Sequence, residues 1–135
     1  MTQQIAFEVT LQAPYEQAIE KVTAALKNEG FGILTRIDVK ATLKEKINAE
    51  FRPYAILGAC NPPLAHRALS HDAQAGLVLP CNVTVEAKDD RSSVVRIADP
   101  DAFLNIGKFA QDPVLLGVAR EAREKLARAA AALRG

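Results

Sequence analysis

The chain has 135 residues, of which 49% are hydrophobic and 24% are charged, and its formal net charge at pH 7 is +1. This composition is too apolar for a disordered segment, so we expect residues 1–135 to fold as a single globular domain, and the balanced charge argues against a nucleic-acid partner. No run approaches the roughly 20 apolar residues of a membrane span, no signal peptide is recognisable at the start, and two cysteines are too few for a disulfide scaffold. These features predict a cytoplasmic domain with no membrane partner.

The first third of the chain predicts two strands and two helices. Residues 4–10 alternate apolar and polar side chains as a strand does, and Pro14 suits the first turn of a helix that follows. Gly30 lies where the left-handed C-cap of that helix is expected. Residues 32–38 predict a second strand, and Asp38 is a good N-cap for a short helix whose apolar residues recur every fourth position. The other face of this short helix carries Lys40, Lys44 and Lys46. We interpret these lysines as solvated surface, with an anion site as the alternative.

The middle third predicts a third strand, residues 54–59, ended by a turn at residues 60–63. Asn61 can cap the next helix, and Pro62 fits its first position. This helix should have about two turns. Its buried face is expected to consist of Leu64, Ala65, Ala68 and Leu69.

The last part of the chain predicts further strands and a long helix. Residues 76–87 are expected to be strand on both sides of Pro80, and a proline in such a pattern indicates an edge strand or a bulge. Residues 94–97 predict another strand, and residues 113–133 a helix. The helix carries a stripe of apolar residues: Leu115, Ala119, Ala122, Leu126, Ala129 and Leu133. We expect the stripe to pack on the sheet, with a contact to a second subunit as the alternative. The element order predicts an α+β fold, a mainly antiparallel sheet with its helices on one face.

Two short segments stand out because each places a Cys-Asn pair beside proline at the end or kink of an apolar strand. The pairs are Cys60-Asn61 and Cys81-Asn82, and they contain both cysteines of the chain. We expect the cysteines to lie on neighbouring strands or strand ends, with sulfurs that share a pocket without forming a disulfide. A cysteine beside a helix N-terminus can be held as a thiolate, and the alternative is an ordinary buried cysteine.

The histidines, His66 and His71, lie between these two segments. His66 should project about one turn into the short helix, whereas His71 should be exposed in a polar turn. Cys60, His66 and Cys81 could together supply three metal ligands only if the segments meet in space, and their spacing matches no zinc pattern. The sequence therefore assigns no metal site.

The stretches YAILGACNPPLAHRAL and GLVLPCNVTVEA resemble the signature of domain-of-unknown-function family 302, a bacterial and archaeal group. The resemblance covers most of the chain, from residue 30 into the last helix. It implies a compact α+β fold similar to a single TATA-binding-protein-like unit, with a strand, a helix, four strands and a helix, and it implies homodimers. It implies no established activity, cofactor or catalytic residue.

Three hypotheses for function follow from these features. The first is a homodimeric ligand-binding or regulatory module with a small-molecule pocket lined by Cys60, Asn61, His66, Cys81 and Asn82. The second is a thiol-dependent redox enzyme in which Cys60 is the nucleophile, Cys81 the resolving thiol and His66 a general base. The third is a purely structural or interaction module that uses the last helix or an exposed sheet edge.

Overall fold

The structure, a computed structural model, describes residues 4–135 and contains one antiparallel sheet with the strand order β1-β5-β4-β3-β2. The strands are β1 (Ala6–Leu11), β2 (Gly32–Asp38), β3 (Tyr54–Cys60), β4 (Cys81–Ala87) and β5 (Ser93–Ala98). The α-helices are α1 (Tyr15–Asn28), α2 (Val39–Ile47), α3 (Pro62–His71), α4 (Pro100–Leu104) and α5 (Pro113–Arg134). Two 3₁₀-helical turns are η1 (Ala73–Val78) and η2 (Gly107–Gln111).

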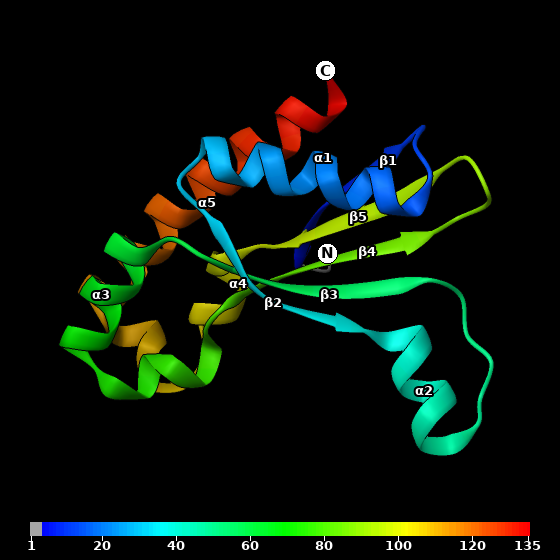
Figure 1. Ribbon diagram of the computed structural model, residues 1–135. Helices are drawn as coiled ribbons and strands as arrows, with labels where there is room; N and C mark the ends of the chain where they lie inside the picture. Colours follow the sequence, from blue (N-terminus) through cyan, green and yellow to red (C-terminus); the bar gives the residue numbers. More distant parts are fainter. Residues whose placement is uncertain (1–3) are drawn as a thin grey trace.

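The two long helices, α1 and α5, lie together over one face of the sheet, while α3, α4 and η1 gather at one end of the molecule and α2 lies at the other (Figure 1). The α+β prediction, an antiparallel sheet with helices on one face, is confirmed. The element order also contains the predicted strand, helix, four strands and helix, with shorter helices inserted between them.

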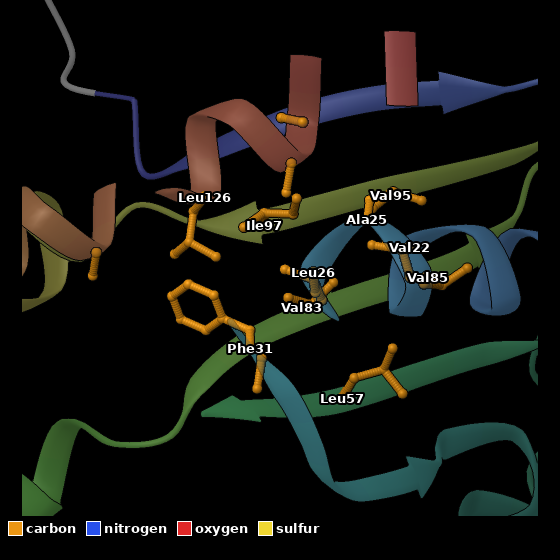
Figure 2. Close-up of a cluster of buried hydrophobic side chains, with 14 of the residues drawn as sticks. Val22, Ala25, Leu26, Phe31, Leu57, Val83, Val85, Val95, Ile97 and Leu126 are labelled. Atoms are coloured by element: carbon orange, nitrogen blue, oxygen red, sulfur yellow. The ribbon is translucent and has the colours of Figure 1, made fainter. Parts of the chain in front are cut away.

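The core forms between the sheet and the two long helices because alternate strand residues point to the same face. Figure 2 shows Val22 and Leu26 of α1 and Leu126 of α5 in the same cluster as side chains of three central strands. The labelled strand residues are Leu57, Val83, Val85, Val95 and Ile97. Burying these apolar side chains is the main favourable contribution to folding, at roughly 25 cal/mol for each Å² removed from water.

The end of α1 places Phe31 in this core. Gly30 adopts φ +84°, the left-handed conformation predicted for it, and its N–H donates to Lys27 O at 3.0 Å. The next N–H, that of Phe31, donates to Leu26 O at 2.9 Å. The chain therefore turns sharply, and the Phe31 side chain is only 2% exposed.

The structure corrects the expectation of strand on both sides of Pro80. Residues 73–78 form η1, and the strand begins only at Cys81. The side chain of Asp72 accepts a hydrogen bond from the Gln74 N–H at 2.9 Å, and such local bonds favour a tight turn over a strand. The expectation of an edge strand or bulge is also wrong, because β4 pairs with β3 and β5 and Pro80 stands just before its first residue.

The apolar stripe of α5 is buried within the same chain, except for Leu133 at its end, which is half-buried. Leu115, Ala119 and Leu126 are fully buried, so these side chains are not available to a second subunit. The first interpretation of the stripe, packing on the sheet, is confirmed by the contacts of α5 with β1.

The apolar side of α2, by contrast, is not buried. Leu43 is half-buried and Ile47 is 69% exposed, because α2 lies beside the ends of β2 and β3 instead of over the sheet (Figure 1). Its lysines are exposed, as the solvated interpretation predicts. One of them, Lys44, pairs with Glu50 at 2.6 Å.

Within residues 4–135, no helix has both the length and the apolar character needed to cross a bilayer.

Candidate functional site

The two Cys-Asn segments lie side by side at one end of the sheet. Antiparallel pairing sets Ala59 of β3 opposite Cys81 of β4, so Cys60 lies one residue beyond that pair. The prediction of neighbouring strand ends is therefore confirmed. Both cysteines are half-buried free thiols.

Asn61 connects this strand end to α3. Its side-chain oxygen accepts a hydrogen bond from the Leu64 N–H at 3.2 Å, which caps the helix as predicted, and Pro62 takes the first helical position. Asn61 is only 8% exposed, so the cap is made inside the protein. The N-terminus of α3 is consequently held against the end of β3.

A cavity of about 310 Å³ lies between this strand end and the surrounding helices. Cys60, Asn61 and Cys81 all line it. The rest of the wall is largely apolar and includes Phe31, Ala59, Leu64, Leu104, Val118 and Ala122. Among the described residues, no Asp, Glu, Lys, Arg or His forms part of this wall.

A second cavity, of about 270 Å³, adjoins the first. The two share five wall residues, which are Leu79, Pro80, Cys81, Pro100 and Leu104. The second cavity is also lined by Asn82 and by the exposed side chains of Leu77 and Phe103.

The structure thus distributes the five predicted site residues unequally. Cys60, Asn61 and Cys81 line the first cavity, whereas Asn82 is exposed and lines only the second. His66 is exposed on α3 and lines neither cavity.

His71 was expected in a polar turn, but it is the last residue of α3. It is exposed, as expected, and its Nε2 lies 2.7 Å from Asp112 Oδ2. This contact joins the end of α3 to the N-terminus of α5, outside both cavities.

The wall around Cys81 disfavours negative charge. Burial, and to a lesser extent the nearby charge of Cys60, raise the pKa of the Cys81 thiol to about 11. Cys81 is therefore a neutral thiol at physiological pH. A wall of this kind suits uncharged ligands better than ionic ones.

Among residues 4–135, no three His, Cys, Asp or Glu side chains converge as a metal-binding group. The three ligands considered from the sequence, Cys60, His66 and Cys81, do not line a common cavity.

Several wall residues were not anticipated from the sequence, in particular Phe31, Leu104 and Val118. Their only sequence signal is apolar character at helical or strand spacing, which core residues share. Leu69, expected to be buried, is 44% exposed and stands at the cavity wall instead.

Comparison with known proteins agrees with this architecture. The family described as "Domain of unknown function DUF302" matches residues 7–133. A crystal structure of an uncharacterized conserved DUF302 protein from Bacillus stearothermophilus is similar over 94% of this chain and 96% of its own, with 28% sequence identity and a TM-score of 0.81. No curated protein matches the chain. The family match spans nearly all of the chain from β1 to α5, and the solved relative has the same fold. The chain therefore belongs to the DUF302 family.

Proposed function

We propose that this protein is a small-molecule-binding module whose ligand occupies the cavity lined by Cys60, Asn61 and Cys81. The observation that carries the proposal is the cavity itself, about 310 Å³ in volume, with an apolar wall and a few polar groups. Ligand sites in proteins typically have volumes of about 300–1,000 Å³ and this kind of wall.

The exposure of two wall residues supports access from solvent. Leu34 is 67% exposed and Leu69 is 44% exposed, and both line the cavity. An apolar ligand that covered these side chains would remove their surface from water, which is favourable.

A fluorescent dye tests the proposal. N-phenyl-1-naphthylamine is uncharged and brightens in apolar sites. Ala65 is half-buried on α3 and lines the cavity, so Ala65→Leu should fill space there and weaken dye binding by about tenfold, the equivalent of about 1.4 kcal/mol. Ala24→Leu, on the exposed face of α1 and outside both cavities, is the matched control and should leave binding unchanged. Absence of dye binding, or equal loss in both variants, would contradict the proposal and favour the structural or interaction module.

A thiol-dependent redox enzyme is the second candidate, because two free thiols line one cavity. Formation of a Cys60–Cys81 disulfide would pass two electrons and two protons to glutathione disulfide, whose S–S bond breaks to give two glutathione thiols. The raised pKa of Cys81 and the position of His66 outside the cavity weigh against this candidate. Mass spectrometry after titration with glutathione disulfide distinguishes the outcomes. A rapid intramolecular disulfide would support the enzyme, and mixed glutathione adducts or no reaction would reject it.

The homodimer and the cytoplasmic location also belong to our proposal. The family resemblance implies the dimer, and two free thiols fit a reducing compartment. Analytical ultracentrifugation tests the first and fractionation of the source cells the second. A monomer at micromolar concentration would reject the homodimer. Recovery of the protein from an oxidising compartment would reject the cytoplasmic location.

A further inference from the structure

We propose that the ligand is an elongated, uncharged molecule whose apolar part fills the first cavity and whose single neutral polar group reaches Asn82 in the second. This inference rests on the proposed function and specifies the class of ligand.

The proposed shape follows from the adjacency of the two cavities. They share Pro80, Cys81 and Leu104 among their common wall residues, so both cavities border the start of β4. A compact ligand would occupy only one of them. A chain-like ligand can occupy both and bury apolar surface in each.

The lack of charge follows from the walls. No Asp, Glu, Lys, Arg or His among the described residues lines either cavity. Charged residues near the wall residues in sequence have partners. Asp99, before Pro100, pairs with Arg123 at 3.1 Å, and Arg67, before Ala68, pairs with Glu121 at 2.6 Å. Asp72, before η1, pairs with Lys108 at 2.8 Å. A carboxylate or phosphate entering the cavities would find no free opposite charge, and leaving an ion unpaired there is costly.

The position of the polar group follows from the two asparagines. The oxygen of Asn61 is already bound to the N–H of Leu64, whereas Asn82 is exposed and lines the second cavity. A primary amide both donates and accepts hydrogen bonds, so Asn82 suits a hydroxyl or a carbonyl group.

Two exposed apolar side chains give the second cavity surface that a ligand can cover. Leu77 is 83% exposed and Phe103 is 44% exposed, and both belong to its wall. An apolar chain in the second cavity would cover surface that water otherwise contacts.

Displacement of N-phenyl-1-naphthylamine by straight-chain primary alcohols, from hexanol to decanol, tests the proposed class. The dissociation constant should fall about fourfold for each added methylene while the chain lengthens within the two cavities. Fatty acids of equal length, measured at pH 8 where they are ionised, should bind at least about tenfold more weakly than the alcohols. Affinity that stays constant from hexanol onward, or that is equal for acids and alcohols, would overturn the inference.

Variants of the second cavity separate this inference from the proposed function. Phe103→Ala should reduce the gain from chain length, and Asn82→Ala should weaken decanol by about fivefold, while hexanol binding should change little. Ala24→Leu again serves as the control, and thermal melting verifies that each variant is folded. If dye and hexanol bind but neither second-cavity variant affects decanol, the inference fails and the proposed function stands. If neither dye nor any alcohol binds, both fail.

Discussion

At the scale of single residues, the position of Cys81 at the start of β4 determines its chemistry. Its side chain is half-buried in a wall without charged groups. Burial, together with the nearby charge of Cys60, raises the pKa of the thiol to about 11 from an ordinary value of 9.0. Nucleophilic reactions of cysteine require the thiolate, so the protonated form of Cys81 reacts slowly at neutral pH.

The first prediction concerns this thiol. In a Cys60→Ser variant, which leaves Cys81 as the only thiol, the rate of alkylation by iodoacetamide should rise with pH to a midpoint well above 9. The midpoint should lie somewhat below about 11, because the charge of Cys60 contributes to the raised pKa and is absent from the variant. Mass spectrometry of samples quenched at intervals measures the rate. A midpoint at or below the ordinary value of 9.0 would contradict the prediction.

At Gly58, the neighbouring side chains limit which residue can take its place. It lies in β3, opposite Asn82 of β4 and beside Thr35 of β2. A Cβ at this position would be 2.8 Å from Pro80 Cγ and would also overlap Thr35 Oγ1. Glycine is therefore required by close approach of side chains on both sides.

We predict that Gly58→Ala destabilises the protein by about 1–3 kcal/mol, the usual cost of overpacking. Urea denaturation measures the change. Combining it with Thr35→Ala, which removes one of the two overlaps, should recover part of the loss in a double-mutant cycle. If the two changes in the free energy of unfolding simply add, the overlap with Thr35 does not account for the destabilisation.

At the scale of the elements, α3 depends on its cap. The helix begins with two prolines, Pro62 and Pro63, which donate no backbone hydrogen bonds, so the first N–H in need of a partner is that of Leu64. The Asn61 side chain accepts that hydrogen bond at 3.2 Å. One residue therefore starts the helix and forms part of the cavity wall.

We predict that Asn61→Ala lowers the free energy of unfolding by about 1 kcal/mol, because the Leu64 N–H loses its partner. Asn61→Ser keeps an oxygen that can cap and should cost only a few tenths of a kcal/mol. Chemical denaturation of both variants measures the difference. Equal losses of unfolding free energy in the two variants would show that the hydrogen bond to the Leu64 N–H does not account for the stabilising effect of Asn61.

At the scale of the whole molecule, an ion-pair network connects parts of the chain that are far apart in sequence. Glu86 of β4 is 8% exposed and binds Arg52, at 2.6 Å, and Arg96 of β5. Arg96 in turn pairs with Glu8 of β1 at 2.6 Å. The network thus links three strands and the segment that precedes β3.

These contacts set the acid dependence of stability. Burial alone would raise the pKa of Glu86, but the hydrogen bonds from Arg96 and Arg52 outweigh burial and hold its pKa below the ordinary value of 4.5. A carboxyl whose pKa is lower in the folded state stabilises the fold above its ordinary pKa. That contribution is lost as the pH falls through the lowered value.

We predict that Glu86→Gln destabilises the protein by about 1–2 kcal/mol at pH 7, a moderate value because both arginines are partly exposed and solvent screens the pairs. The difference between wild type and variant should shrink as the pH falls from 6 to 3. Urea denaturation across this pH range measures it. A difference that is constant with pH would show that Glu86 does not control acid stability.

The sequence by itself determined the elements whose signals are local. The second strand was predicted with the bounds that it has, residues 32–38, and the caps at Gly30, Asp38 and Asn61 are where they were expected. Caps and strand alternation depend on residues within a few positions of one another, so they can be recognised without the rest of the fold. The nearness of the two cysteines was also predictable, because two strand ends of similar composition had to enter one small sheet.

Only the tertiary structure decided what surrounds the cysteines. Phe31 and Val118 stand almost ninety positions apart yet line the same cavity, and nothing in the local sequence of either distinguishes a cavity wall from a core. His66 lies between the two Cys-Asn segments in sequence, but the direction of α3 turns it to solvent. Residues 76–78 have the composition of a strand, but the cap at Asp72 draws them into η1. Apolar character predicts that a side chain avoids water, whereas the packing of distant elements determines whether that side chain fills the core or borders a space for a ligand.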